Sequence, residues 1–304
     1  MSSNALITGS SGLLGLNLLL HEPQPYQFYA HINKRRVNLA NIQTITIDLG
    51  NLKSIEEALK IYSPKVVIHA AGITNVDGCD EDPETANFIN GKVPSNIAKV
   101  CKDHGVKLVH ISTDHLFDGT NPFTDEEAPV KPLNAYGYSK ALGEEGVLKN
   151  NDEAIIIRCN FFTWGPSYRQ SFSDFIYDNL SKGKAISLAD DFFYTPALAQ
   201  NLIEAILSLL GKDAKGIFNV VGSERLSKYK FGMNMAKIFG YNDDLINKVN
   251  WASLGAKAIR PADMSLSDQK IRKFLGYDLG TSNRNIQGLK TLMNTNLYNK
   301  VRSL

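Results

Sequence analysis

The chain begins with a glycine-rich turn between a short apolar run and a helical pattern, and this turn constrains the fold more than any other feature. Residues 4–8 read Asn-Ala-Leu-Ile-Thr, and residues 9–15 read Gly-Ser-Ser-Gly-Leu-Leu-Gly. This order predicts a strand, a tight turn and a helix. Gly9 can take a turn conformation closed to other residues, Gly12 lets the backbone approach a pyrophosphate at the helix N-terminus, and Gly15 lets helix and strand pack closely. The turn therefore predicts a dinucleotide-binding site.

More strand-then-helix units follow in the first half of the chain. Apolar runs predict the second to fifth strands at residues 26–31, 44–47, 65–69 and 106–111. Helical patterns lie at about 52–62 and 83–104. Buried parallel strands separated by helices are typical of a doubly wound sheet. We therefore predict an α/β fold with a doubly wound parallel sheet of the Rossmann type.

In such sheets, ligands bind beyond the carboxyl ends of the strands. This rule selects the residues that follow each predicted strand as one rim. The predicted cofactor-binding residues are Gly9, Ser11, Gly12, Leu13, Leu14, Asn33, Arg35, Asp48, Leu49, Ala70, Ala71 and Gly72, together with Tyr136 and Lys140 discussed below.

The end of the second strand carries cations and no carboxylate, since residues 31–36 read His-Ile-Asn-Lys-Arg-Arg. An NAD site usually offers an acidic residue there, whereas a 2′-phosphate attracts cations. We therefore expect NADPH and leave NADH open; the alternative for residues 34–36 is a solvated loop. Asp48 is expected at the adenine edge, although an aspartate also commonly starts a turn.

Tyr136 and Lys140 lie four residues apart in the segment 133–145, which has a helical pattern. Residues at this spacing share one helix face, so the ammonium of Lys140 is expected near the phenol of Tyr136. A nearby cation favours the phenolate and lowers the pKa of tyrosine, which makes Tyr136 a usable proton donor or acceptor. Tyr138 has Leu142 at the same spacing and lacks such a partner. The alternative is a chance pair on an exposed helix face.

Thr113 follows the fifth strand, where its hydroxyl can hydrogen-bond a substrate carbonyl oxygen and stabilise the alkoxide that forms. Ser112 is the adjacent candidate for this role. Without the surrounding motifs, the pair would be interpreted as a Ser/Thr turn.

Composition and charge exclude several classes of function. The 304 residues carry a net charge of +2 without blocks of one sign, which argues against nucleic-acid partners or a polybasic membrane patch. Three cysteines without metal-ligand spacing indicate a reducing compartment and no metal site. No basic leader precedes the first apolar run, and the apolar stretch 13–20 is far shorter than the ~20 residues that span a bilayer. We expect a cytoplasmic protein without a signal peptide.

The regular alternation of predicted strands and helices ends after residue 160. Helical stretches are predicted at about 168–182, 196–210 and 227–239, with short strands near 185–188 and 217–221. We predict a cofactor-binding domain over 1–160, with a segment at about 195–221 that returns to it. The smaller substrate-binding region would cover 161–194 and 222–304. Trp164 and Trp251 are candidates either for stacking on a nucleotide base or for the core. The segment 282–304 has only a loose helical pattern.

Together these motifs resemble the extended short-chain dehydrogenase/reductases. The glycine turn at 8–15, the hydroxyl of Thr113 and the Tyr-x-x-x-Lys pair appear in that family's order and approximate spacing. Within the family, the chain resembles the dTDP-4-dehydrorhamnose reductase (RmlD-like) branch. The segments that carry this likeness are 69–77 with Asn90, 112–119, 216–220 with 224–229, and 260–266.

The resemblance implies reduction of the 4-keto group of a nucleotide-linked 6-deoxysugar with NADPH, in deoxysugar and surface polysaccharide biosynthesis. Tyr136 would give a proton to the carbonyl oxygen, Thr113 would hydrogen-bond it, and Lys140 would lower the phenol pKa and hold the nicotinamide ribose. Thr74, Val76 and His115 would bind the sugar. Arg260 would pair with the substrate diphosphate, and the alternative for it is an ordinary surface cation. The chain differs from the typical sequence of this branch at two places, which leaves the identity of the substrate open. Residues 158–166 differ from the usual segment, and His115 replaces a usual tyrosine.

Two other functions stay open at this point. One is a catalytically idle, cofactor-binding subunit that regulates a partner enzyme, as in the related methionine adenosyltransferase regulatory subunit; the intact Tyr136, Lys140 and Thr113 argue against it. The other is an epimerase or dehydratase of the same superfamily, for which Asp114 offers an acid/base group. A homodimer is also left open.

Overall fold

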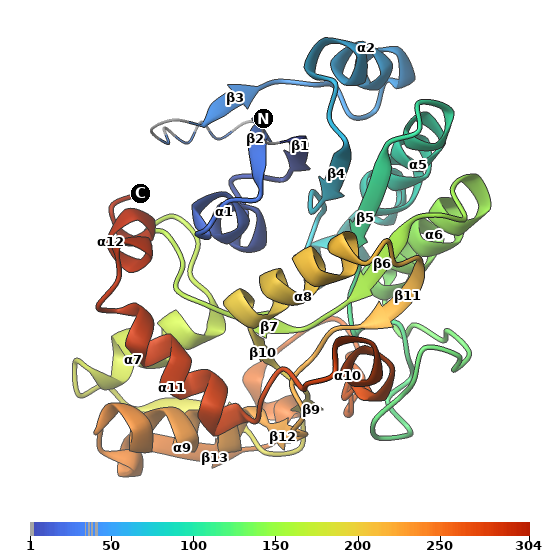
Figure 1. Cartoon of the computed structure of the whole chain (residues 1–304). Coiled ribbons are helices and arrows are strands. Elements are labelled where there is room, and N and C mark those ends of the chain that lie inside the picture. Colours follow the sequence, from blue (N-terminus) through green and yellow to red (C-terminus); the bar gives the residue numbers. More distant parts are fainter. Residues whose placement is uncertain (1–2, 34, 36, 38, 40–41) are drawn as a thin grey trace.

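The computed structural model describes residues 3–33, 35, 37, 39 and 42–304. Its centre is a seven-stranded sheet with the order β11-β6-β5-β4-β1-β2-β3, in which every neighbouring pair is parallel. The strands are β1 (Ser3–Thr8), β2 (Tyr26–His31), β3 (Gln43–Ile45), β4 (Val66–His69), β5 (Lys107–Ile111), β6 (Ile155–Arg158) and β11 (Gly216–Asn219). The predicted doubly wound α/β fold is confirmed (Figure 1).

Both faces of the sheet are buried, which explains why its strands are almost continuously apolar. Alternate residues of a strand point to opposite faces. In β6, Ile155 and Ile157 pack in one hydrophobic cluster and Ile156 packs in the other. The same alternation separates Ile7 from Leu6 in β1.

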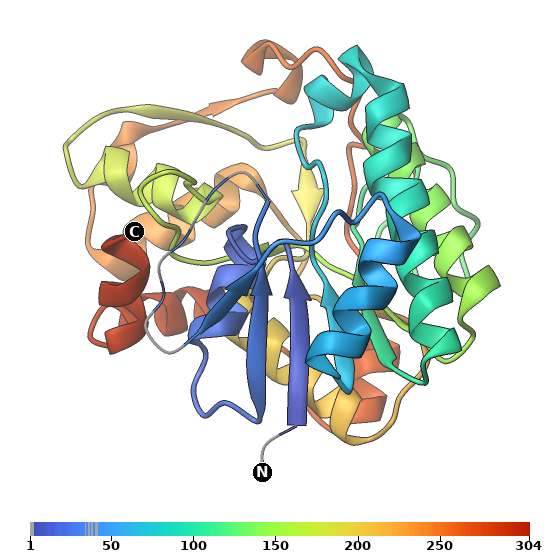
Figure 2. The ribbon, with the colours of Figure 1, turned by 90° about the horizontal axis from the view of Figure 1, so that it is seen from above.

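Helices cover the two faces. Residues of α1, α8 and α10 belong to one cluster, and residues of α2, α5 and α6 belong to the other. Figure 2 shows α2, α5 and α6 together on one side of the sheet. The helices of this half are α1 (Leu13–Leu20), α2 (Leu52–Tyr62), α3 (Val76–Glu81), α4 (Pro83–Ala86), the π-helical η1 (Asn87–Lys92), α5 (Val93–Asp103), α6 (Ala135–Asn150), α8 (Ala199–Gly211) and α10 (Gln269–Leu275).

The predicted helix over 83–104 is interrupted by η1. Within this segment, the side chain of Asn90 bonds both backbone groups of Ile73 and the hydroxyl of Ser139. A Cβ on Gly143 would lie only 2.3 Å from the Asn90 carbonyl oxygen, so α6 approaches η1 closely. The interruption serves contacts with distant residues, which a local periodicity does not reveal.

The second half adds small sheets and helices beside the main sheet. These elements are β7 (Phe161–Phe162), β8 (Ile186–Ala189), β9 (Phe193–Tyr194), β10 (Ala197–Leu198), β12 (Leu226–Ser227), β13 (Ile246–Val249), α7 (Phe172–Leu180), α9 (Lys228–Phe239), η2 (Asp243–Leu245), η3 (Trp251–Leu254), α11 (Ser282–Leu292) and α12 (Asn296–Arg302). The strands pair as β10-β7, β12-β9 and β13-β8. The predicted division into a cofactor domain and a substrate-binding region stays a prediction.

The second half has its own hydrophobic cluster around Trp164 and Phe231. Trp164 is 2% exposed, its indole N–H donates to the carbonyl oxygen of Leu289 at 2.9 Å, and its ring makes edge contacts with Tyr177 and Tyr298. The interpretation of Trp164 as a base-stacking residue is therefore wrong, because its ring is enclosed by core aromatics.

Two predicted helices start later than their sequence pattern suggested. The helix predicted from residue 168 begins at Phe172, because Ser171 and Asp174 form a capping box there. The helix predicted from residue 196 begins at Ala199, because Ala197 and Leu198 pair with β7. Within the described part of the chain, no helix has both the length and the apolar character needed to cross a membrane.

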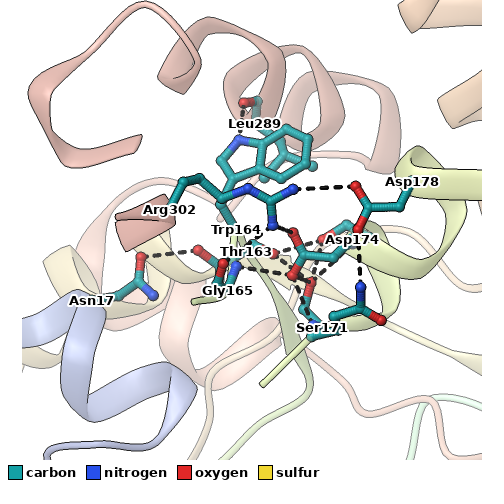
Figure 3. A network of polar contacts seen from close by, with 11 residues as sticks. Asn17, Thr163, Trp164, Gly165, Ser171, Asp174, Asp178, Leu289 and Arg302 are labelled. Carbon is teal, nitrogen blue, oxygen red and sulfur yellow. Dashed lines mark hydrogen bonds and ion pairs between the residues drawn. The ribbon is translucent and has the colours of Figure 1, made fainter. Parts of the chain in front are cut away.

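The C-terminal helix α12 packs on α1, the helix that follows the glycine turn (Figure 1). It also reaches α7, because Arg302 donates to Asp174 at 3.0 Å and to Asp178 at 3.2 Å (Figure 3). Asp174 is completely buried. The loosely patterned segment 282–304 thus supplies the counter-ion of a buried carboxylate.

Removing this counter-ion should destabilise the fold. Arg302→Ala leaves Asp174 buried without its cation, and we expect the free energy of unfolding to fall by about 3 kcal/mol, near the low end for a broken buried pair since Arg302 is partly exposed. Urea denaturation measures the change. The matched control is Arg284→Ala, whose side chain is 72% exposed and whose pair with Asp278 spans 3.6 Å. It should change stability by less than about 0.5 kcal/mol, and equal losses in both variants would contradict the assignment.

Candidate active site

A cleft of about 1120 Å³ opens at the carboxyl ends of the strands. The chain runs from β1 to β2 and β3 in one direction and from β4 to β11 in the other, so the loops after β1 and β4 diverge. The predicted cofactor-binding residues all line this cleft: Gly9, Ser11, Gly12, Leu13, Leu14, Asn33, Arg35, Asp48, Leu49, Ala70, Ala71, Gly72, Tyr136 and Lys140. The structure therefore brings the whole predicted rim together.

The glycine turn needs its glycines for steric reasons. Gly9 has a φ of +74°, and a Cβ there would lie 2.6 Å from the backbone nitrogen of Ala71. A Cβ on Gly15 would lie 2.4 Å from the carbonyl oxygen of Gly9. Gly12 is the N-cap of α1, and no described side chain caps this end of the helix. The first amides of α1 are thus available to an anion.

The loops after β2 and β3 form the far end of the cleft. Arg35 lies over the ring of Tyr168, with its guanidinium carbon 4.2 Å from the ring centroid. Asp48 accepts a hydrogen bond from the backbone of Gly50 at 3.0 Å. Its carboxylate therefore starts a turn, which was the alternative to a role at the adenine edge. Lys34 and Arg36 lie outside the described residues.

Tyr136 and Lys140 lie in the first turns of α6 and are 8% and 6% exposed. Asn134 caps this helix by accepting from the backbone of Gly137 at 2.8 Å. The ammonium of Lys140 donates to the carbonyl oxygen of Ile111 at 2.7 Å and lies 3.5 Å from Nε2 of His110. The pair is therefore buried in the cleft and does not lie on an exposed helix face.

The prediction that Lys140 brings the phenol pKa down is wrong for this structure. Burial raises the pKa of Tyr136, and the nearby hydroxyl of Thr113 offsets only part of that rise. Burial likewise lowers the pKa of Lys140 to about 8, against the opposing effect of the Glu144 carboxylate. Loss of solvation disfavours the charged form of both groups and is the largest cause of both shifts.

Thr113 lies at the end of β5 and is 4% exposed. Its hydroxyl donates to the carboxylate of Asp114 at 3.2 Å and accepts from the backbone of His115 at 3.3 Å. Asn160 donates to the other carboxylate oxygen of Asp114 at 2.6 Å. The neighbouring Ser112 hydroxyl is buried and has no hydrogen-bond partner among the described residues. Both candidate hydroxyls line the cleft.

Three of the four predicted substrate residues, Thr74, Val76 and His115, line the cleft. The ring of His115 meets the ring of Tyr136 edge-on, with 5.3 Å between centroids. Arg260 lies outside the cleft lining. Its guanidinium pairs with Asp77 at 3.3 Å and lies over Trp251 at 5.2 Å, so its charge already has a partner within the chain.

Three cleft residues from the second half are not among the residues predicted from the sequence. Asn160, Tyr168 and Arg169 all line the cleft. Residues 168 and 169 were assigned to a helix that begins later, and nothing in the local pattern indicates their contacts. His69 was included only in a motif, yet it lines the cleft with its Nδ1 at 2.6 Å from the Thr8 hydroxyl.

The buried ammonium of Lys140 should make stability depend on pH. Its pKa is lower in the folded chain than the ordinary 10.5, so between about pH 8 and 10.5 the unfolded chain binds more protons and stability rises with pH. The wild-type free energy of unfolding should therefore rise relative to that of Lys140→Met. The difference between the two should increase by about 2–3 kcal/mol from pH 7.5 to 10. Urea titrations across this range measure it, and a flat difference would contradict the burial of the charge.

The comparisons with known proteins match nearly the whole chain. Residues 3–293 match the family described as the RmlD substrate binding domain. The probable low-salt glycan biosynthesis reductase Agl14 of Haloferax volcanii is 30% identical, over 94% of this chain and 97% of its own length. Methionine adenosyltransferase 2 subunit beta of Xenopus laevis is 28% identical, over 90% of this chain and 82% of its own.

Among solved structures, the dTDP-4-dehydrorhamnose reductase of Bacillus anthracis in complex with NADP superimposes with a TM-score of 0.84. The match covers 96% of this chain and 99% of that one at 23% identity, which shows a shared fold. The family match and the Haloferax relative go further, because each spans the sheet, the cleft and most of the second half. The chain belongs to the RmlD substrate-binding domain family, within the extended short-chain dehydrogenase/reductase fold.

Proposed function

We propose that this chain reduces the 4-keto group of a nucleotide-linked 6-deoxysugar with NADPH, in deoxysugar or surface polysaccharide biosynthesis. One observation carries the proposal: Tyr136, Lys140 and Thr113 meet in a single buried cleft that also contains the glycine turn. A proton donor, a cation and a hydroxyl beside a dinucleotide site suit the reduction of a carbonyl.

The residues of the cleft fit a dinucleotide cofactor. The uncapped amides of α1 and the close backbone at Gly9 and Gly12 would hold a pyrophosphate. Arg35, which follows β2 where an NAD site would offer a carboxylate, favours NADPH over NADH. When bound, the cofactor supplies the hydride.

The side chains of the chain itself handle the proton and the developing charge. Because burial raises the pKa of Tyr136, the phenol is fully protonated at neutral pH and is ready to give its proton to the carbonyl oxygen. Thr113 would turn its hydroxyl from Asp114 to the same oxygen. With a pKa of about 8, Lys140 is mostly charged at neutral pH, and it provides positive charge one helical turn from the phenolate that results.

The substrate class rests on the family and on the sugar-facing residues. Agl14 is named a glycan biosynthesis reductase, which supports a sugar-nucleotide substrate for this chain. Thr74, Val76 and His115 would face the sugar. Arg260 would have to leave Asp77 to reach the substrate diphosphate. A homodimer and the location in the cytoplasm stay predictions.

Two further functions remain as alternatives. The likeness to the methionine adenosyltransferase 2 beta subunit favours a cofactor-binding regulatory subunit, while the complete set of Tyr136, Lys140 and Thr113 favours catalysis. An epimerase or dehydratase would need a free acid/base group, but the carboxylate of Asp114 is engaged by Asn160 and Thr113.

The reductase proposal predicts a loss of activity on removing one hydroxyl. Purified protein mixed with NADPH and a dTDP-linked 4-keto-6-deoxyhexose should consume the reduced cofactor, followed at 340 nm. Tyr136→Phe should lower kcat by about 100-fold or more, because it removes the proton donor. The control is Tyr138→Phe, two residues away and 52% exposed, which should keep wild-type activity.

Two outcomes would count against the proposal. Equal rates in Tyr136→Phe and wild type would remove the phenol from the reaction. Tight NADPH binding without turnover of any dTDP- or UDP-linked 4-keto sugar would favour the regulatory subunit.

A further inference from the structure

The residues between Trp164 and α7 form a loop whose two ends are tied to one carboxylate. Oδ2 of Asp174 accepts from the backbone of Gly165 at 2.9 Å and from that of Ser171 at 2.8 Å (Figure 3). Arg302 donates to the other oxygen of Asp174. The base of this loop, called here the 165–171 loop, is therefore fixed.

The tip of the 165–171 loop lies across the cleft. The hydroxyl of Tyr168 donates to the carbonyl oxygen of Ser11 in the glycine turn at 3.1 Å, and its ring lies under Arg35. Arg169 donates to the Thr74 hydroxyl, beyond β4, at 2.8 Å. The tip thus contacts the loops after β1, β2 and β4, which are the loops that a dinucleotide in this cleft would touch.

Positive charge near the glycine turn is scarce. Residues 9–16 contain no lysine or arginine. Among the described residues that line the cleft, the lysines and arginines are Arg35, Lys140 and Arg169. Burial lowers the pKa of the lining histidines His31, His69 and His115, which favours their neutral forms. The described part of the chain therefore gives the cleft three cations, Arg35, Lys140 and Arg169.

Of these three described cations, Arg169 follows Tyr168, whose hydroxyl bonds the glycine turn, and it has no other task that the described residues show. Arg35 lies at the end of β2, where the adenosine ribose binds in such folds, and Lys140 is held at Ile111 beside Tyr136. Within the described chain, the side chain of Arg169 donates to the neutral hydroxyl of Thr74. Its neighbour Tyr168 contacts the turn itself.

We propose that Arg169 binds the pyrophosphate of the dinucleotide cofactor, opposite the N-terminus of α1. A helix N-terminus carries only about half an elementary charge, whereas the pyrophosphate carries two negative charges. The planar guanidinium can bond two phosphate oxygens at once. The second half of the chain thereby contributes to cofactor binding through the 165–171 loop. This inference rests on the dinucleotide cofactor of the proposed function and does not depend on the sugar.

Binding measurements without any sugar test the proposal. We expect Arg169→Gln to weaken NADPH, NADH and ADP-ribose by about tenfold to a hundredfold, as for loss of a charge-assisted hydrogen bond. Adenosine 2′-monophosphate, which lacks a pyrophosphate, should bind as in wild type. Arg169→Lys should recover part of the loss. Isothermal titration calorimetry gives all of these dissociation constants.

Arg35→Gln serves as the contrasting variant, because it should weaken NADPH and adenosine 2′-monophosphate and leave NADH unchanged. Arg284→Gln, at an exposed arginine, controls for net charge.

Wild-type affinity of Arg169→Gln for NADPH and ADP-ribose would overturn the proposal. The proposal would also be overturned if Arg169→Gln weakened only the binding of dTDP or UDP, because the guanidinium would then bind the substrate diphosphate. A melting temperature equal to that of wild type would show that each variant is folded. Absence of sugar turnover would leave these affinities unaffected, so the two proposals fail separately.

Discussion

The site depends on one close backbone contact, between the glycine turn and the loop after β4. Gly9 has a φ of +74°, and any Cβ there would overlap Ala70 and Ala71. This contact holds the loops after the two central strands together at the point where the sheet reverses direction. The cleft forms at that point, and the first amides of α1 open into it. Local backbone sterics thereby decide where a ligand can bind.

Burial determines the electrostatics of this cleft. Tyr136 and Lys140 stand on one helix face, yet loss of water shifts both toward their neutral forms. His110 lies 3.5 Å from the Lys140 ammonium and stacks on His69 with 5.3 Å between ring centroids, and burial lowers the pKa of both histidines. A protonated phenol, one helical turn from an ammonium, suits a site that delivers a proton and then stabilises the resulting phenolate.

The second half of the chain is tied to the first through a buried carboxylate. Asp174 orders the two ends of the 165–171 loop and receives its counter-ion from Arg302, in the helix that packs on α1. Thr163 and Gln200 both donate to the side chain of Asn17 in α1, at 3.0 Å each. The helix that would carry the pyrophosphate is therefore braced by segments more than 140 residues away in sequence.

The sequence by itself determined the features that depend on neighbouring residues: the first five strands, the glycine turn, the rim residues from Gly9 to Gly72, and the placement of Tyr136 and Lys140 on one face. Hydrophobic periodicity and backbone conformation are local properties, so they can be interpreted residue by residue. Tertiary structure alone decided the direction of the Tyr136 pKa, the pairing of Arg260 with Asp77, the burial of Trp164 and the position of Arg169. Each of these depends on desolvation or on a partner distant in sequence, because solvation and ion pairing are set by whatever the folded chain brings into contact.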